Sequence, residues 1–352
     1  MSRLKSRAER VLEAVGCDAF VASDPFTVAW LTGFAADETW GPNPFALAPL
    51  AVVRSDGSIS AIVSEEEAPA LEGCGCEVLA YPGFTTGPLD IGEARRRVLA
   101  ALRLRGRVAV ESGALSMRGV EPVQADAHAL RLLRAVKDEG EIARLRAAIR
   151  VCDAGQAAAR SALRAGVSEL EAWGEVQSAM QLAAGGRLSL LCDFATGERT
   201  AAIGGPPTER VIAAGELAIV DLVPRLAGFF GDSCSTFAVG GEAPGEARSE
   251  HARCVEALER GLAALAPGVV AGDLDSVVRA GLDYPHHSGH GIGRAPHEEP
   301  RIVPGSATVL APGMVVALEP ASYPGPWGMR TERVALVTED GCEVLSAHDI
   351  SL

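Results

Sequence analysis

The spacing of apolar residues in the first third of the chain alternates between strand and helix patterns. Strands are predicted at 18–23, 48–53, 59–64 and 108–111, and helices at 25–31, 65–72 and 90–104. The turn formers of 54–58 lie between two of these strands and predict a hairpin. Gly33 would end the first helix, because glycine accepts the left-handed conformation common at helix ends. Strands that alternate with helices predict an α/β domain.

From about residue 129 the apolar patterns predict longer helices and strands than in the first third. Helices are predicted at 129–138, 141–164, 244–265 and 273–282, and strands at 187–195, 217–223, 228–239, 314–323, 328–338 and 342–346. Ser168 and Glu171 have the spacing of a capping box, which marks a helix start. The change of pattern near 130–140 predicts an N-terminal α/β domain over residues 1–135 and a second domain over 136–352. The whole chain is therefore expected to be of the α+β class.

Four carboxylates adjoin the most apolar strands of the second domain. Asp221 and Glu319 each follow four apolar residues. Asp232 comes just after a run with two phenylalanines, and Glu332 stands two residues before another apolar run. One such acid is equally well explained as a strand-end cap or as the partner of an arginine. Because a buried carboxylate without a counter-charge is very costly, the four together predict a shared cation.

A histidine cluster adds to these acids. Four of the seven histidines lie between residues 286 and 297, namely His286, His287, His290 and His297. Glycines at 289, 291 and 293 predict a close approach of the backbone to another group. The cluster favours metal binding, proton transfer or both over a polar loop whose histidines bond only to backbone.

The residue types of this candidate site favour two divalent ions. Four carboxylates with one imidazole form an oxygen-rich ligand set, which suits Mn²⁺ first, with Co²⁺ or Zn²⁺ as alternatives. Two ions can activate a shared water and stabilise the developing charge. A hairpin turning near residue 226 would bring Asp221 and Asp232 face to face. Arg330 and Glu332 are two residues apart and would share a strand face, where Arg330 could orient a carboxylate.

Composition limits the partners and the cellular setting. The 352 residues are 48% apolar and 22% charged, with a net charge of −14, which argues against nucleic acid and anionic membranes as partners. We expect no secretory signal and no spanning segment, since no uncharged apolar run reaches about 18 residues. The eight scattered cysteines, including the pair Cys74 and Cys76, are typical of reduced thiols in a cytoplasmic protein.

At these residues the sequence resembles the metallopeptidases of the pita-bread fold, and within them the Xaa-Pro peptidases, prolidase and aminopeptidase P. The matching motifs are Val220-Asp221-Leu222, Gly231-Asp232-Ser233, Ser288-Gly-His290-Gly-Ile-Gly293, His297-Glu298, Leu318-Glu319-Pro320 and Arg330-Thr-Glu332. They cover about 135–352, whereas the first domain is only loosely similar to the N-terminal domain of creatinase and prolidase. The resemblance implies a pita-bread catalytic domain.

The resemblance also implies roles. Asp221 would bind one ion and His290 and Glu319 the other, while Asp232 and Glu332 would bridge the two. Glu319, His297 and His286 would be the catalytic groups. His286, His297, Tyr323 and Arg330 would contact or support the substrate. His287 is left without a role.

Two positions depart from the family pattern. Many relatives carry a substrate-contacting histidine where this chain has Gly204, and relatives often have arginine where it has Ser235. The first change removes a hydrogen-bond donor near the substrate, so it bears on the substrate and not on the metal ligands.

The function expected from the resemblance is metal-dependent hydrolysis of the Xaa-Pro bond of a small peptide with proline in second position, as an Xaa-Pro dipeptidase. Alternatives are an aminopeptidase P that cleaves longer peptides, a hydrolase of a non-peptide C–N bond, and a non-catalytic binding protein on the same fold. A homodimer is expected. The segment 37–46 with Trp40 is a candidate for a dimer or substrate contact.

Overall fold

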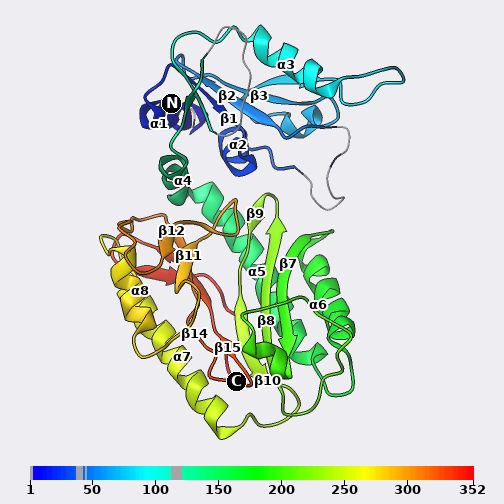
Figure 1. Cartoon of the computed structure of the whole chain (residues 1–352), viewed down its shortest axis with the longest axis vertical. Helices are drawn as coiled ribbons and strands as arrows, with labels where there is room; N and C mark the ends of the chain where they lie inside the picture. Colours follow the sequence, from blue (N-terminus) through cyan, green and yellow to red (C-terminus); the bar gives the residue numbers. More distant parts are fainter. Residues whose placement is uncertain (1–2, 37–42, 44–45, 112–120) are drawn as a thin grey trace. The chain divides into compact units, whose positions relative to one another are not determined.

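A computed structural model describes residues 3–36, 43, 46–111 and 121–352 of the chain. The chain forms two compact units, Met1–Arg134 and Ala135–Leu352 (Figure 1). Most of the segment 37–46, including Trp40, lies outside the described residues. Among the described residues, no helix combines the length and the apolar character needed to cross a lipid bilayer.

The first unit is built on a mixed six-stranded sheet in the order β4-β3-β2-β1-β5-β6. Its elements are α1 (Arg3–Val15), β1 (Ala19–Ala22), α2 (Pro25–Thr32), β2 (Leu50–Arg54), β3 (Ile59–Ser64), β4 (Glu77–Tyr81), α3 (Ile91–Ala101), β5 (Val108–Val110), β6 (Val123–Gln124) and α4 (Ala127–Ala135). β2 and β3 form the predicted antiparallel hairpin, and β3 pairs with β4 in parallel. Helices and strands alternate as predicted.

One predicted helix of this unit is wrong. In place of a helix over 65–72 there is only a 3₁₀ turn, η1 (Ala68–Leu71). Gly73 and Gly75, both at a positive φ of 78°, turn the chain into β4 before a longer helix can form.

The second unit contains two main sheets covered by four helices. The strand orders are β10-β8-β7, with β9 on β8, and β12-β11-β13-β16-β17, while β14 and β15 form a short ribbon. The strands are β7 (Ser189–Thr196), β8 (Leu217–Leu226), β9 (Phe229–Phe230), β10 (Cys234–Ala238), β11 (Gly289–Gly291), β12 (Glu298–Ile302), β13 (Val315–Leu318), β14 (Ala321–Ser322), β15 (Met329–Arg330), β16 (Arg333–Val337) and β17 (Cys342–Val344). The helices are α5 (Glu139–Ala162), α6 (Glu169–Ala184), α7 (Gly245–Ala264) and α8 (Ala271–Arg279), with a 3₁₀ turn η2 (Gly197–Ala201).

Local sequence explains where α5 and α6 begin. Asp138 and Glu141 form a capping box at α5, and Ser168 and Glu171 form the predicted one at α6. The apolar faces of both helices pack on β7, β8 and β10 in one buried cluster that includes Val151, Val176 and Phe194. In the other half, α7 and α8 cover β12, β13 and β16 through a second cluster. Each sheet is thus covered by helices on one face (Figure 1).

The predicted strands are interrupted where the acids lie. The expected strand 228–239 is divided into β9 and β10, and Asp232 lies between them. The expected strand 314–323 breaks after Leu318, at Glu319. The expected strand 328–338 breaks between Arg330 and Arg333, so that Arg330 and Glu332 do not share a strand face as predicted.

Candidate metal centre

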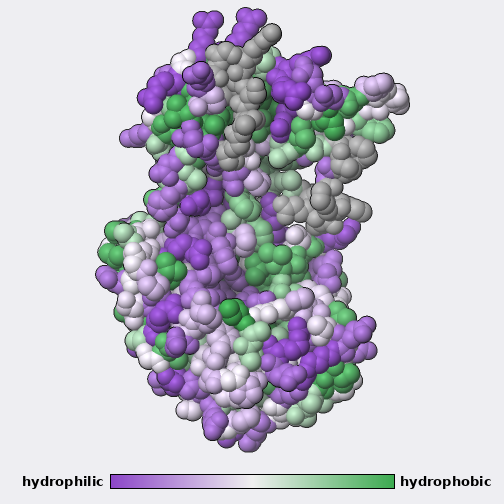
Figure 2. All heavy atoms as spheres, viewed as in Figure 1, coloured by the Kyte–Doolittle hydropathy of each residue, from purple (hydrophilic) through white to green (hydrophobic). Residues whose placement is uncertain are grey.

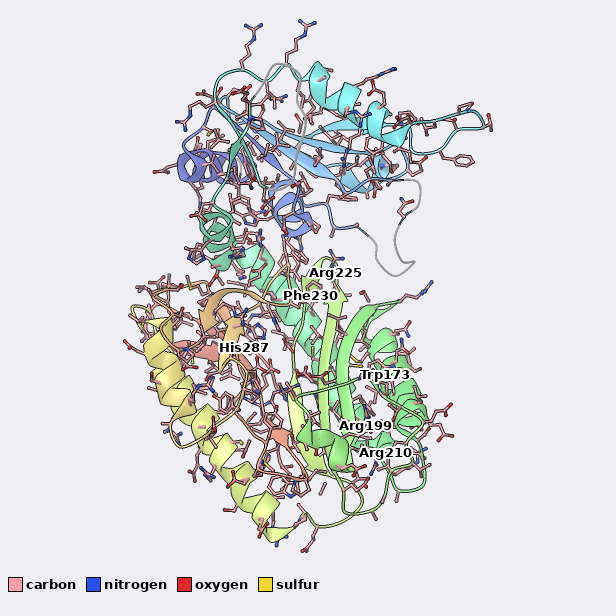
Figure 3. All side chains as sticks on the ribbon, in the orientation of Figure 1. Trp173, Arg199, Arg210, Arg225, Phe230 and His287 are labelled. Carbon is pink, nitrogen blue, oxygen red and sulfur yellow. The ribbon has the colours of Figure 1, made fainter. Side chains whose placement is uncertain are left out.

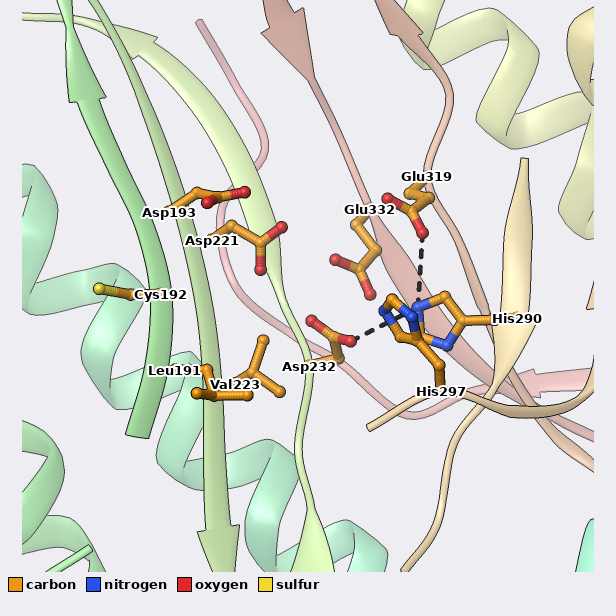
Figure 4. Close-up of a pocket in the computed structure, with 10 residues that line it drawn as sticks. All are labelled: Leu191, Cys192, Asp193, Asp221, Val223, Asp232, His290, His297, Glu319 and Glu332. Atoms are coloured by element: carbon orange, nitrogen blue, oxygen red, sulfur yellow. Dashed lines mark ion pairs between the residues drawn. The ribbon is translucent and has the colours of Figure 1, made fainter. Parts of the chain in front are cut away.

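A cavity of about 190 Å³ lies where the two sheets of the second unit approach each other. Figure 2 shows hydrophilic residues gathered in the hollow of this unit. Figure 4 shows the lining residues Leu191, Cys192, Asp193, Asp221, Val223, Asp232, His290, His297, Glu319 and Glu332. The five residues predicted as metal ligands therefore line one cavity, although they come from segments up to 111 residues apart in the sequence.

The carboxylates converge from both sheets. Oxygens of Asp221, Asp232 and Glu332 lie within 4.8 Å of one another. His290 Nε2 lies 3.6 Å from Oδ2 of Asp232 and 3.4 Å from Oε1 of Glu319. The residue opposite Asp221 in the β8–β10 pairing is Cys234, so Asp232 reaches the site from the break before β10 and not as a direct cross-strand partner.

The buried carboxyl groups of the cavity repel one another, and a bound cation would offset this repulsion. Burial, reinforced by neighbouring carboxylates, raises the pKa of Asp232 and of Glu332 well above its ordinary value. Burial also raises the pKa of Asp221 to about 6, although the adjacent Arg330 opposes the rise. Oδ1 of Asp221 and Oε1 of Glu332 are buried without a hydrogen-bond partner among the described residues. Buried oxygens without donors are what a metal ion would satisfy, so these residues fit the predicted divalent ions.

Glu319 differs from the other acids. Burial by itself would raise its pKa, but the imidazoles of His287 and His290 hold the pKa of Glu319 well below its ordinary value. Glu319 is therefore the member of the set that is most readily ionised before a metal binds.

The histidines of the cluster have different surroundings. Nδ1 of His290 lies 3.0 Å from the carbonyl oxygen of Gly291, which can only accept, so Nδ1 carries the hydrogen and Nε2 keeps its lone pair. Burial, followed by the charges of His290 and His287, lowers the pKa of His297 to about 3, which leaves His297 neutral near pH 7. His290 is thus ready to act as a ligand through Nε2, and His297 as a neutral hydrogen-bonding group.

Arg330, Tyr323 and His286 form a hydrogen-bonded chain. Arg330 Nη2 donates to Oδ2 of Asp221 at 2.6 Å, and Nη1 donates to the Tyr323 hydroxyl at 3.3 Å. The hydroxyl lies 3.2 Å from Nε2 of His286, whose Nδ1 donates to the carbonyl of His287 at 2.8 Å. The predicted orientation of a carboxylate by Arg330 is thus present as a contact with Asp221.

Asp193 is a residue of the site that the sequence analysis did not single out. It pairs with Asp221 across β7 and β8, and Arg330 Nη2 donates to its Oδ2 at 2.8 Å. A Cβ atom on Gly204 would lie 2.0 Å from Oδ2 of Asp193, so the aspartate occupies the space beside the glycine. The sequence does carry a signal for Asp193, because it is the single acid of a mostly apolar strand, as Asp221 is.

Comparisons with known proteins agree with this geometry. Residues 143–339, more than half of the chain, match the profile of metallopeptidase family M24. The probable dipeptidase PepE of Mycobacterium tuberculosis is 37% identical over 143 residues, 38% of each chain. The Xaa-Pro dipeptidase of Pyrococcus furiosus is 33% identical over 225 residues, 61% of this chain and 64% of the relative. The chain thus matches about two fifths to two thirds of the length of these relatives.

A solved structure extends the similarity to the whole chain. The Xaa-Pro dipeptidase from Bacillus anthracis superposes with a TM-score of 0.84 over 99% of both chains at 24% identity, which shows a common fold. The predicted α+β architecture, an N-terminal α/β domain followed by a pita-bread domain, is confirmed. Taken with the family match, this means that the chain belongs to metallopeptidase family M24.

Proposed function

We propose that this protein hydrolyses the peptide bond between any first residue and a proline in second position, as an Xaa-Pro dipeptidase. The observation that carries the proposal is the convergence of Asp221, Asp232, His290, Glu319 and Glu332 on one cavity. Relatives named as Xaa-Pro dipeptidase and dipeptidase support the same activity. A small peptide is the proposed substrate.

We propose that two divalent ions are held by these residues. Asp221 would hold one ion, His290 and Glu319 would hold the other, and Asp232 and Glu332 would supply oxygens to both. When bound, such ions lower the pKa of water and stabilise developing negative charge. Mn²⁺ is the proposed ion, with Co²⁺ or Zn²⁺ as alternatives, because carboxylates dominate the ligand set.

The protein's own side chains supply the remaining chemistry. Glu319, kept ionised by its imidazole neighbours, takes up a proton from the attacking water on a carboxylate oxygen. His297 lines the cavity as a neutral imidazole and stabilises the carbonyl oxygen or passes a proton to the proline nitrogen. His286, held by Tyr323, lines the proline side of the site, and Arg330 fixes Asp221.

The test is proline release by the purified protein. Loaded with Mn²⁺, it should release proline from Xaa-Pro dipeptides, and removal of the metal should abolish the reaction. The Asp221→Ala variant should lose bound metal and activity together, while Glu259→Ala, an exposed acid on α7, serves as the matched control. Intact substrate across a panel of Xaa-Pro dipeptides would refute the proposal. A non-catalytic binding protein should show no coupling between metal and function.

The same assay separates the alternatives within the family. An aminopeptidase P would prefer Xaa-Pro-Yaa peptides, whereas a dipeptidase would prefer the free dipeptide. Asp193 beside Gly204 gives the substrate side a carboxylate, which keeps a hydrolase of another C–N bond as the second candidate. Non-peptide amides therefore belong in the panel.

Two further properties are proposals supported by composition and family. We infer a homodimer, to be measured by sedimentation equilibrium, and a cytoplasmic location, in line with eight cysteines that are free. A monomer at micromolar concentration would overturn the first of these, and secretion of the tagged protein would overturn the second.

A further inference from the structure

His287 contacts Glu319 although its sequence position gave it no role. Its side chain is 14% exposed, and Nε2 lies 2.7 Å from Oε1 of Glu319. Its ring centroid lies 5.1 Å from that of His290 and 5.1 Å from that of His297. Figure 3 labels His287 near the orange strands β11 and β12. The three imidazoles are close enough to share an ion. His287 is therefore either a further metal ligand or a hydrogen-bond donor to Glu319.

Arg301 distinguishes these two roles. Its Nη2 lies 2.9 Å from Nδ1 of His287, from the neighbouring strand β12. A guanidinium group has only donors and stays protonated, so Nδ1 of His287 must accept. In the neutral imidazole the hydrogen is then on Nε2, the atom that faces Glu319. A nitrogen that carries a hydrogen has no lone pair for a metal.

His290 has the opposite arrangement. Its Nδ1 donates to a backbone carbonyl, which leaves the lone pair on Nε2. His287 and His290 thus hold opposite tautomers. The tautomer of His290 is set by a carbonyl that can only accept, and that of His287 by a guanidinium group that can only donate. Nε2 of His290 is suited to bind metal, and Nε2 of His287 is suited to donate.

We propose that His287, held in its Nε2–H form by Arg301, is a positioning residue that aims the carboxylate of Glu319 into the cavity. The inference rests on the proposed function, in which Glu319 holds an ion and takes up a proton. On the other side, Arg330 Nε lies 3.8 Å from Oε2 of Glu319. Without His287 the carboxylate would be drawn towards the guanidinium of Arg330.

The contact between Nε2 of His287 and Oε1 of Glu319 is short, but its angle is not that of a hydrogen bond. Oε1 of Glu319 is buried and has no hydrogen bond of good angle, although Nε2 of His287 is 2.7 Å away. A rotation of the imidazole or of the carboxylate would complete the bond. Partners of this kind behind a metal ligand are worth about 10–100-fold in affinity or activity.

The first test needs no activity. In the zinc-loaded protein with ¹⁵N-labelled histidine, His287 should show the Nε2–H tautomer and His290 the Nδ1–H tautomer with Nε2 bound to metal. Arg301→Gln should weaken the preference of His287, and a His287→Gln spectrum assigns its signals. A metal-bound Nε2 or an Nδ1–H tautomer at His287 would overturn the proposal, whatever reaction the enzyme catalyses.

The second test measures metal binding and kinetics. His287→Leu should lower kcat about 10–100-fold with little change in KM, while calorimetry still finds the same number of bound ions. His287→Gln, which keeps a donor, should recover most of kcat. Arg301→Gln should lower kcat less, and adding it to His287→Leu should cause no further loss. His128→Gln, an exposed histidine of α4, is the matched control.

The outcomes separate this inference from the proposed function. If the wild-type protein cleaves no Xaa-Pro peptide, the proposed function fails, and the tautomer still tests the contact. If the wild type is active, loss of an ion in both His287 variants shows a ligand and refutes the positioning role. Wild-type kcat in His287→Leu, or additive losses with Arg301→Gln, would refute it as well. Thermal unfolding checks that each variant is folded.

Discussion

Gly291, next to His290 on β11, provides a sharp test of how the metal centre is built. β11 lies between β12 and β13, so its backbone is packed on both sides. A Cβ atom on Gly291 would lie 2.1 Å from the carbonyl oxygen of Glu299 and 2.5 Å from its carbonyl carbon. These are backbone atoms, which cannot rotate away. Ordinary contact begins near 3.4 Å, so Gly291→Ala must move β11 and β12 apart by about 1 Å.

The expected cost follows from this displacement. Overpacking of this kind lowers the free energy of unfolding by about 1–3 kcal/mol. For a unit of this size the melting temperature should fall by about 2–12 °C, at about 2–4 °C per kcal/mol. His290 is on the displaced strand, so calorimetry should also find weaker metal binding. Gly341→Ala, with no atom within 4 Å of its added Cβ, is the matched control. A melting temperature equal to that of the control would refute the described packing of β11.

Three further predictions concern other parts of the second unit. Lys137→Met removes the ammonium group that lies 3.0 Å from Oε2 of Glu298, with both side chains 2% exposed, and should cost about 3–5 kcal/mol of unfolding free energy in urea titration. Burial opposes ionisation of Glu169, but Thr208, Thr196 and Arg199 lower its pKa. Its contribution to stability is therefore present above about pH 4.5, its unfolded range, and is lost as the pH falls through the lower folded pKa. Glu169→Gln should thus reduce the loss of stability on acidification, measured as melting temperature against pH. Gly204→Ala should displace Asp193 and lower kcat/KM without changing the number of bound ions.

Each of these has a result that would contradict it. A Lys137→Met protein as stable as the wild type would mean that the backbone N–H groups of Arg294 and Ala295 are enough to stabilise Glu298 without the ammonium group. Parallel acid profiles for Glu169→Gln and wild type would show that Glu169 does not titrate with folding. Unchanged kinetics in Gly204→Ala would mean that the position of Asp193 does not affect the reaction, and Gly205→Ala, with a milder contact of 3.2 Å to Arg199, is its control.

Simple physical rules applied to the sequence found most of the candidate ligands. Asp221 and Glu319 stand at the ends of apolar runs, and a charge in such a place needs a partner whatever the fold. The helix start at Ser168 was predicted because a cap is a local hydrogen bond between residues three apart, and the same kind of box at Asp138 was found only in the structure. The rule that a charge beside an apolar run needs a partner also applies to Asp193 in β7.

The sequence did not reveal where strands break. Asp232, Glu319 and Glu332 lie at interruptions, which periodicity cannot locate because the flanking residues remain apolar on both sides. The breaks depend on the other strands that the chain meets there. Glu332 N donates to the carbonyl of Cys234, and Arg330 pairs with Ala321. Cys234 is far from Glu332 in the sequence, and it becomes the partner of Glu332 only when the two sheets pack.

By itself, then, the amino-acid sequence determined the kinds of ligand, their order and the helices that carry their own caps, since these depend on residue type and on neighbours within a few positions. The tertiary structure decided which carboxylates meet and which nitrogen of His287 carries its hydrogen. It also decided that Asp193 fills the space that a side chain at Gly204 would take. These features depend on contacts between residues that are not neighbours in the sequence, and on the burial that removes water from them.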